Sequence, residues 1–227
     1  MRVAQVGTLI YSTPPKRYGG VELVVYNLSK GLKERGIDCT VFATEDSEVD
    51  GQLVPICPPL GWREEEKIAY YEHLEACQVL YRQDEFDIIH IHFYPHSHQW
   101  FFSLPLFRKP VIFTIHSLLE NLTKIYRKFP HLTHVPMVSI SNEQRKPLPF
   151  ANYVATVYNG IDVSIFPYEE KKENFLVFIG RAVFEKGVAE AIEIAKRLGK
   201  ILYLIVKVDT PQEEEYFSKY VKPYIDG

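Results

Sequence analysis

Cysteine is scarce in this sequence. Three cysteines, Cys39, Cys57 and Cys77, occur among 227 residues, and no CxxC pair is present. An odd number of widely spaced cysteines does not form the disulfide framework that is typical of small secreted proteins. The sequence therefore predicts free thiols and a reducing compartment.

Long apolar runs are also missing. No segment approaches the ~20 consecutive apolar residues that a membrane-spanning helix needs. The N-terminal VAQVGTLI is too short and too lightly charged for a signal peptide. We expect a cytoplasmic protein. Peripheral attachment to a membrane stays open, because the sequence does not show where its 15 tyrosines, 14 phenylalanines and 2 tryptophans lie.

Neither sign of charge dominates the chain. The formal net charge is -3 and the pI is about 6.3, which argues against a nucleic-acid partner or an anionic membrane surface. Hydrophobic residues make up 46% of the sequence and charged residues 24%, which is ordinary for a globular protein. A chain of this length forms one large domain or two small ones.

Residues 3–36 join an apolar run, a loop rich in proline and glycine, and an amphipathic helix that stops at Gly36. A glycine loop that opens into a helix is a candidate anion site, because unpaired N–H groups and the positive end of the helix dipole point the same way. Gly19 and Gly20 would let a phosphate approach the backbone. The alternative is that the two glycines only form a tight turn. The buried helix face is predicted to hold Val21, Val24, Val25, Leu28 and Leu32.

Short apolar segments then alternate with helical ones. A helix is predicted over residues 64–83, with an acidic first turn and Arg82 in the last turn. Its predicted core stripe is Ile68, Tyr71, Leu74, Cys77 and Tyr81. Strands that alternate with helices need crossover connections, so we expect a largely parallel sheet with helices on both faces. The predicted strands, after the first at 3–10, are 39–43, 52–56, 86–93, 110–115, 137–140 and 154–158.

A second α/β region follows a polar connection. We take residues 1–165 as a first domain, 166–174 as a linker and 175–227 as an incomplete second domain. The second domain is predicted to contain strands at 175–181 and 201–208 and helices at 188–198 and 212–224. Two strands and two helices are marginal as an independent domain.

Three groups of polar residues follow predicted strands, where ligands bind in open α/β sheets. Arg181 and Lys186, around the second domain's first strand, are placed to clamp a diphosphate, although a solvated loop is the alternative. His116 directly follows the apolar PVIFTI run. After the segment VSI, Ser141 or Asn142 is a candidate helix N-cap.

Histidines are concentrated in one segment, HIHFYPHSH. The pattern faintly resembles the HxHxDH run of metallo-hydrolases, but Pro95 stands where that run has an aspartate. His90 and His92 share one face of a strand, which is consistent with the end of a strand opening into a cleft. We predict no metal here. The four histidines of the segment are His90, His92, His96 and His98.

Six segments of the sequence, taken together, point to one protein family more specifically than any one of them does alone. PPKRYGGVE, FDIIHIH, FTIHS, VSISNEQR, VYNGID and GRAVFEKG, in this order, resemble the N-terminal domain and the beginning of the C-terminal domain of family 4 glycosyltransferases. The resemblance runs from Met1 to about Lys207. It implies a GT-B fold, in which two Rossmann-like domains face each other across a cleft.

The resemblance implies a retaining transfer of a sugar from a nucleoside diphosphate donor to a carbohydrate or lipid-linked acceptor, without a metal or other cofactor. Gly19 and Gly20 match the loop that contacts donor phosphate, and Arg181 and Lys186 match the pair that neutralises the leaving diphosphate. His116 matches a histidine beside the donor sugar and is the predicted catalytic residue. Candidate acceptor-side or cleft residues are Tyr18, Glu22, His92, Ser141 and Arg145.

The family's acidic E-x7-E segment would lie well beyond residue 227. We therefore predict a truncated glycosyltransferase-type protein with weak or no activity alone. The alternative is a non-catalytic sugar or nucleotide-sugar binding subunit that completes its site with another chain. A dinucleotide-dependent enzyme ranks last, because no GxGxxG follows the first strand of either domain. The two-stranded sheet predicts a homodimer that covers its edges and apolar face.

Overall fold

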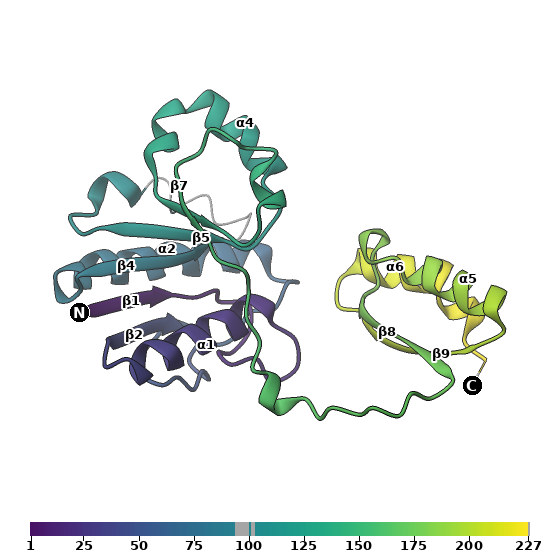
Figure 1. The fold of residues 1–227 in the computed structure, drawn as a ribbon. Coiled ribbons are helices and arrows are strands. Elements are labelled where there is room, and N and C mark those ends of the chain that lie inside the picture. The colour runs from purple at the N-terminus through teal and green to yellow at the C-terminus, as the bar shows by residue number, and fades with distance from the viewer. Residues whose placement is uncertain (94–99, 101–102, 227) are drawn as a thin grey trace. The chain divides into compact units, whose positions relative to one another are not determined.

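The computed structural model describes residues 1–93, 100 and 103–226. The chain divides into two compact units, Met1–Ile161 and Asp162–Gly227 (Figure 1). The boundary therefore lies slightly before the end of the predicted first domain, and the predicted linker at 166–174 belongs to the second unit.

The first unit is built on a seven-stranded sheet in which every neighbouring pair of strands is parallel. The strand order is β3-β2-β1-β4-β5-β6-β7, so the order along the chain reverses at β1 and β4. The predicted α/β class with a Rossmann-like parallel sheet is confirmed. The strands are β1 Arg2–Val6, β2 Asp38–Ala43, β3 Gln52–Pro55, β4 Ile88–Phe93, β5 Val111–Ile115, β6 Met137–Ser139 and β7 Tyr153–Thr156.

Helices cover both faces of this sheet. Side chains alternate along a strand, so Val41 and Phe42 of β2 point to opposite faces. Val41 belongs to the buried cluster that includes Val21 and Val25 of helix α1 (Gly20–Glu34). Phe42 belongs to the cluster that includes residues of helix α2 (Glu65–Arg82) and helix α4 (Glu120–Lys128). Short 3-10 turns in this unit are Gln83–Glu85, Leu104–Leu106, Pro130–His134 and Glu143–Arg145.

Two predicted elements differ most from the structure at their ends. The first strand, predicted over 3–10, ends at Val6. The N–H of Gly7 still donates to the carbonyl oxygen of Phe42 at 3.0 Å, and the backbone then leaves the sheet. The last helix, predicted to reach residue 224, ends at Tyr220, because Pro223 has no N–H with which to continue it.

The predicted core stripe of α2 is wrong at three of its five positions, since only Ile68 is buried and Tyr71 is half-buried. Tyr81 is 88% exposed, and Leu74 and Cys77 are also exposed. The predicted stripe advances mostly by three residues, which falls about 60° short of a full turn at each step in a helix of 3.6 residues per turn. The buried face consists instead of Ile68, Glu72, Glu75, Ala76 and Val79.

The second unit is smaller. Strands β8 (Phe175–Arg181) and β9 (Ile201–Lys207) form a two-stranded parallel sheet. Helix α5 (Val188–Leu198) begins after Gly187 and ends at Gly199, and both glycines have the positive φ that favours this residue at helix ends. Helix α6 is Pro211–Tyr220, and the remaining turns are Val163–Ile165, Phe184–Lys186 and Lys222–Tyr224.

One face of the β8–β9 sheet packs on α5, where Phe178 and Leu204 lie against the buried cluster that contains Val188 and Ile192. The opposite face is apolar and exposed, with Ile179 at 74%. We call this opposite face the β8–β9 outer face. It consists of Phe175, Val177, Ile179, Ile201, Tyr203 and Ile205.

No helix in the part of the chain that the structure describes is both long and apolar enough to cross a bilayer.

A buried carboxyl group on α2 makes stability depend on pH. Burial, and the charge of nearby Glu72, raise the pKa of Glu75 well above 4.5. A raised pKa favours the folded state below about pH 4.5, and this stabilisation is lost as the pH rises through the folded-state pKa. Glu75→Gln should therefore be more stable than the parent chain at pH 8, by ~1.4 kcal/mol for each unit of pKa shift.

Urea denaturation at several pH values measures this effect. The difference in the free energy of unfolding between Glu75→Gln and the parent chain should shrink toward pH 4.5. Glu66→Gln, an exposed position on the same helix, is the matched control. A stability difference that does not change with pH would contradict the prediction.

Candidate functional site

The candidate residues of the first unit lie at the carboxyl edge of its sheet. The glycine loop follows β1, His92 stands near the end of β4, and His116 directly follows β5. Because all the strands are parallel, these ends meet at one edge. The strand order reverses at β1 and β4, which is where ligands bind in open α/β sheets.

The two glycines of the loop have different environments. Gly19 is buried, and an added Cβ would lie 2.6 Å from Cβ of Pro15 and 2.7 Å from Oε2 of Glu22. Gly20 is exposed and has open space around it. The backbone can therefore follow this path only with glycine at position 19, whereas position 20 tolerates a side chain.

Glu22 lies beneath the loop. It is 3% exposed, stands in the first turn of α1, and accepts a hydrogen bond from the Thr8 hydroxyl group. A carboxylate in the first turn is favourable because it meets the positive end of the helix dipole. Glu22 therefore ties the residues after β1 to the beginning of α1.

The loop is also attached to the connection between β2 and β3. The N–H of Thr13 donates to Ser47 Oγ at 2.9 Å, and the N–H of Glu48 donates to the carbonyl oxygen of Thr13 at 2.7 Å. Lys16 forms an ion pair with Asp46 at 2.8 Å. The loop is therefore held by the connection between β2 and β3 as well as by Glu22 of α1.

Tyr18 is exposed and makes an edge-to-face contact with Tyr11, with ring centroids 6.2 Å apart. Of the candidate acceptor-side residues, Tyr18 is the one whose side chain is exposed.

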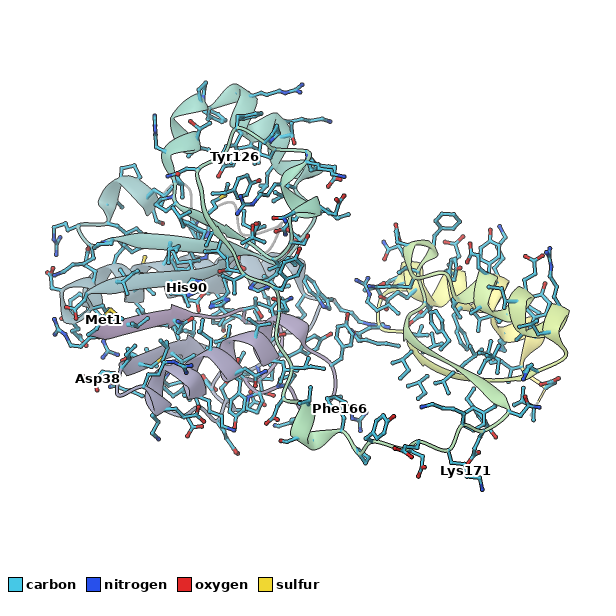
Figure 2. The ribbon with its side chains drawn as sticks, viewed as in Figure 1. Met1, Asp38, His90, Tyr126, Phe166 and Lys171 are labelled. Atoms are coloured by element: carbon cyan, nitrogen blue, oxygen red, sulfur yellow. The ribbon has the colours of Figure 1, made fainter. Side chains whose placement is uncertain are left out.

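The histidines of β4 and β5 form one chain of contacts with Gln5 of β1. His92 Nε2 is 2.6 Å from Gln5 Oε1, and His92 Nδ1 is 3.0 Å from His116 Nε2. His90, in the middle of β4 (Figure 2), places Nε2 2.7 Å from Thr114 Oγ1. The rings of His92 and His116 stack with centroids 5.3 Å apart.

These histidines are neutral at neutral pH. Burial lowers the pKa of His90 and of His116 to about 4. The pKa of His92 falls well below 6.5, first through burial and then through the neighbouring imidazoles. The three rings therefore act as hydrogen-bond donors and acceptors and not as cations.

Residues after β6 hold the backbone around His116. The side-chain nitrogen of Gln144 donates to the carbonyl oxygens of Ile115 and Ser117, at 2.8 Å each. Its oxygen accepts from the N–H of Ile140 at 2.8 Å. Gln144 therefore binds both residues that flank His116.

The predicted residues Ser141 and Arg145 lie in the same connection. Ser141 Oγ accepts a hydrogen bond from the N–H of Gln144 at 3.1 Å. The element that follows is a short 3-10 turn, Glu143–Arg145, whose N-cap Asn142 makes no side-chain cap bond. Arg145 Nε donates to Ser139 Oγ at 2.8 Å, and its guanidinium lies 4.6 Å from the centroid of the Tyr153 ring. Both side chains are thus engaged by neighbouring protein groups.

Gln5 and Gln144 were missed by the sequence reasoning. The available signal for Gln5 is its place as the one amide within the apolar VAQVG strand. Gln144 falls within the segment VSISNEQR, but the pattern does not show that its amide returns to β5.

The predicted cations of the second unit lie at the carboxyl edge of β8. Arg181 ends that strand, and its Nε donates to Glu213 Oε1 at 2.6 Å. Glu213 is 1% exposed, and its Oε2 accepts from the N–H groups of Asp209 and Thr210. Lys186 is exposed and ends the turn before Gly187.

Glu213 is ionised in this arrangement. Burial alone would raise the pKa of Glu213, but the hydrogen bond from Arg181 and the two backbone N–H groups lower it below its usual value. The ion pair therefore fixes one side of the Arg181 guanidinium at the end of β8.

No group of three or more His, Cys, Asp or Glu side chains is arranged to hold a metal ion among the residues that the structure describes. His96 and His98 lie outside the described residues, so that part of the predicted histidine segment has no structural description.

These features define a Rossmann-like α/β protein. The first unit has a parallel sheet whose strand order reverses beside a glycine loop, and the second unit begins again with a pair of parallel strands. The family model of Glycosyltransferase Family 4 matches residues 18–165, which is more than half of the chain. The chain belongs to this family.

Solved glycosyltransferase structures share the fold. AviGT4, a glycosyltransferase involved in avilamycin A biosynthesis, is 23% identical with a TM-score of 0.62, and the match covers 99% of this chain. Sucrose-phosphate synthase from Thermosynechococcus elongatus is 16% identical with a TM-score of 0.68, covering 99% of this chain and 68% of that one. The catalytic domain of Starch Synthase IV from Arabidopsis thaliana, bound to ADP and acarbose, is 15% identical with a TM-score of 0.61, covering 98% and 72%.

This chain spans 61% of the length of AviGT4. No curated protein matches it.

The two glycines of the loop provide a matched pair of substitutions. Gly19→Ala should destabilise the first unit by ~1–3 kcal/mol, because its Cβ would overlap with Pro15 and Glu22. Gly20→Ala should change stability by less than ~0.5 kcal/mol. Chemical denaturation of both variants measures the difference. Equal effects at the two positions would contradict the close packing around Gly19.

Proposed function

We propose that this chain carries the acceptor-side unit and part of the donor-side unit of an enzyme that transfers a sugar from a nucleoside diphosphate to a carbohydrate or lipid-linked acceptor. The observation that carries the proposal is that the glycine loop and His116 follow parallel strands at the same edge of the sheet, in a chain that belongs to glycosyltransferase family 4. By family resemblance the transfer retains the anomeric configuration and needs no metal cofactor.

In the proposed reaction, the beginning of α1 receives donor phosphate. The first hydrogen bond of this helix runs from the N–H of Leu23 to the carbonyl oxygen of Gly19 at 3.0 Å. The N–H groups before Leu23 belong to the helix end that attracts anions. The open space at Gly20 supports close approach of a phosphate to the backbone.

Arg181 and Lys186 are proposed to stabilise the leaving diphosphate. Departure of a nucleoside diphosphate builds negative charge, and cations held in advance at that position lower the barrier. The bond to Glu213 supports this role, because it holds the guanidinium in one orientation before a ligand arrives.

His116 is proposed to contact the donor sugar. Its low pKa supports a hydrogen-bonding role, since a neutral ring has one N–H donor and one acceptor lone pair. Of the candidate acceptor contacts, Tyr18 is exposed, whereas Glu22 and His92 are buried and support the site from below.

Activity of this chain alone is proposed to be weak.

The second candidate function is a sugar or nucleotide-sugar binding subunit that completes its site with another chain. The exposed apolar β8–β9 outer face favours it, because such a face is typical of an interaction surface.

The proposed compartment is the cytoplasm, with attachment at the membrane periphery as a further part of the proposal. Cys39 and Cys57 are free and buried, and burial raises the pKa of their thiols to about 11 and about 12. Cys77 is exposed and also free, and the lack of a disulfide among the three cysteines supports a reducing compartment.

Isothermal titration of the chain with UDP, GDP and ADP, and with their glucose or mannose conjugates, tests the donor side. Arg181→Ala and Lys186→Ala should each weaken binding about tenfold, since each removes a charged hydrogen bond to phosphate. Lys222→Ala, an exposed cation of the same unit, is the control and should bind as the parent chain does.

Two outcomes of this titration count against the proposal. Binding that survives both substitutions would exclude the phosphate role of Arg181 and Lys186. Absence of binding to every nucleotide would favour the second candidate function.

We also propose that two copies of the chain associate through the β8–β9 outer face. Ile179→Glu or Ile205→Glu should abolish a dimer that light scattering after gel filtration detects at micromolar concentration, because a charge would be buried in the interface. Ile194→Glu, an exposed position on α5, should leave the dimer intact. A parent chain that stays monomeric would contradict the proposal.

A further inference from the structure

The amide of Gln5 lies between two histidines and offers each of them a different atom. Its oxygen is 2.6 Å from His92 Nε2, and its nitrogen is 3.4 Å from His90 Nδ1. An amide oxygen only accepts and an amide nitrogen only donates. The hydrogen must therefore be on Nε2 of His92, whereas Nδ1 of His90 carries the lone pair.

The tautomer of His92 determines the tautomer of the neighbouring His116 ring. A neutral imidazole has one N–H, so Nδ1 of His92 is an acceptor. His116 Nε2, 3.0 Å away, must then donate to it, which leaves the lone pair of His116 on Nδ1. On the other branch, His90 Nε2–H donates to Thr114 Oγ1 at 2.7 Å.

Burial makes this order persist. Gln5 is 1% exposed and His92 is 3% exposed, so water does not compete for the hydrogen bonds of these two side chains. Which nitrogen of a histidine carries the proton is set by the bond that the other nitrogen makes. An unsatisfied buried donor costs ~1–3 kcal/mol, which is enough to select one tautomer.

Two separate contacts thus act on His116. Gln144 binds the carbonyl oxygens on both sides of it and restrains its backbone. His92 binds Nε2 and restrains the ring. The nitrogen that remains for a ligand is Nδ1.

We propose that Gln5 and His92 are positioning residues that hold His116 as the Nε2–H tautomer, so that its Nδ1 accepts a hydrogen bond from a hydroxyl group of the bound sugar. The sugar part of this inference rests on the proposed function. The tautomer part rests only on the contacts within the first unit.

The ligand-free chain, labelled with ¹⁵N-histidine, tests the tautomers by long-range ¹H–¹⁵N correlation at neutral pH. His90, His92 and His116 should each show a protonated Nε2 and an unprotonated Nδ1. Single substitutions of the three histidines identify their signals. A spectrum in which His116 carries its proton on Nδ1 would overturn the proposal.

Substitutions at Gln5 separate the two branches. Gln5→Glu keeps an acceptor for His92 but offers no donor to His90. His92 and His116 should therefore keep their tautomers. His90 should move its single proton from Nε2 to Nδ1 to donate to the carboxylate, and Thr114 Oγ1 should then donate to Nε2. Gln5→Met removes the acceptor, so the Nδ1–H forms of His92 and His116 should become populated.

Thr114→Val is the matched control. It removes the partner of His90 and leaves the contact between His92 and His116, so the signal of His116 should not change. A His116 tautomer that is insensitive to Gln5→Met would exclude the role of Gln5. If Gln5→Met does not fold, Gln5→Leu takes its place, because it also removes the acceptor of His92 Nε2. The response of His90 to Gln5→Glu tests the amide nitrogen alone.

Ligand addition then tests the acceptor role. UDP-glucose, GDP-mannose and ADP-glucose are added separately, and calorimetry establishes which of them binds. A bound sugar hydroxyl should move the ¹⁵N signal of His116 Nδ1 upfield, and binding without such a shift would exclude the contact. Absence of binding would overturn the proposed function and the sugar contact together, whereas the tautomers are decided by the ligand-free spectrum.

Discussion

The parallel pairing of β1 with a strand on each side is the constraint on which the first unit depends. Val6 lies opposite Phe42 of β2 and opposite Ile91 of β4. This pairing fixes the point at which the strand order reverses, and the glycine loop must leave from that point. It also places Gln5 beside His90, so the polar contacts at the sheet edge follow from the same register.

Hydrophobic periodicity predicted the class of fold and most of the elements because it reports which segments are buried. The seven strands of the first unit were each expected, with differences mainly at their ends. The pattern failed on α2, where Tyr81 is exposed and Glu75 is buried. A rule that assigns apolar residues to the core cannot anticipate a helix that turns a carboxyl group inward.

The candidate site was predictable in its position but not in its internal contacts. Residues after parallel strands meet at one edge, which located His116 and the glycine loop from sequence alone. The partners of these residues are distant in sequence. Gln5 and His92 are 87 positions apart, and Gln144 reaches back 29 positions to Ile115. No local spacing encodes such contacts, because the register of the sheet creates them.

The bond between Arg181 and Glu213 has a mechanical consequence. Glu213 also binds the backbone at the beginning of α6, so one carboxylate joins the end of β8 to the start of that helix. The guanidinium is thereby anchored to the first turn of α6 as well as to its own strand. A displacement of α6 along its axis would therefore displace the Arg181 guanidinium as well.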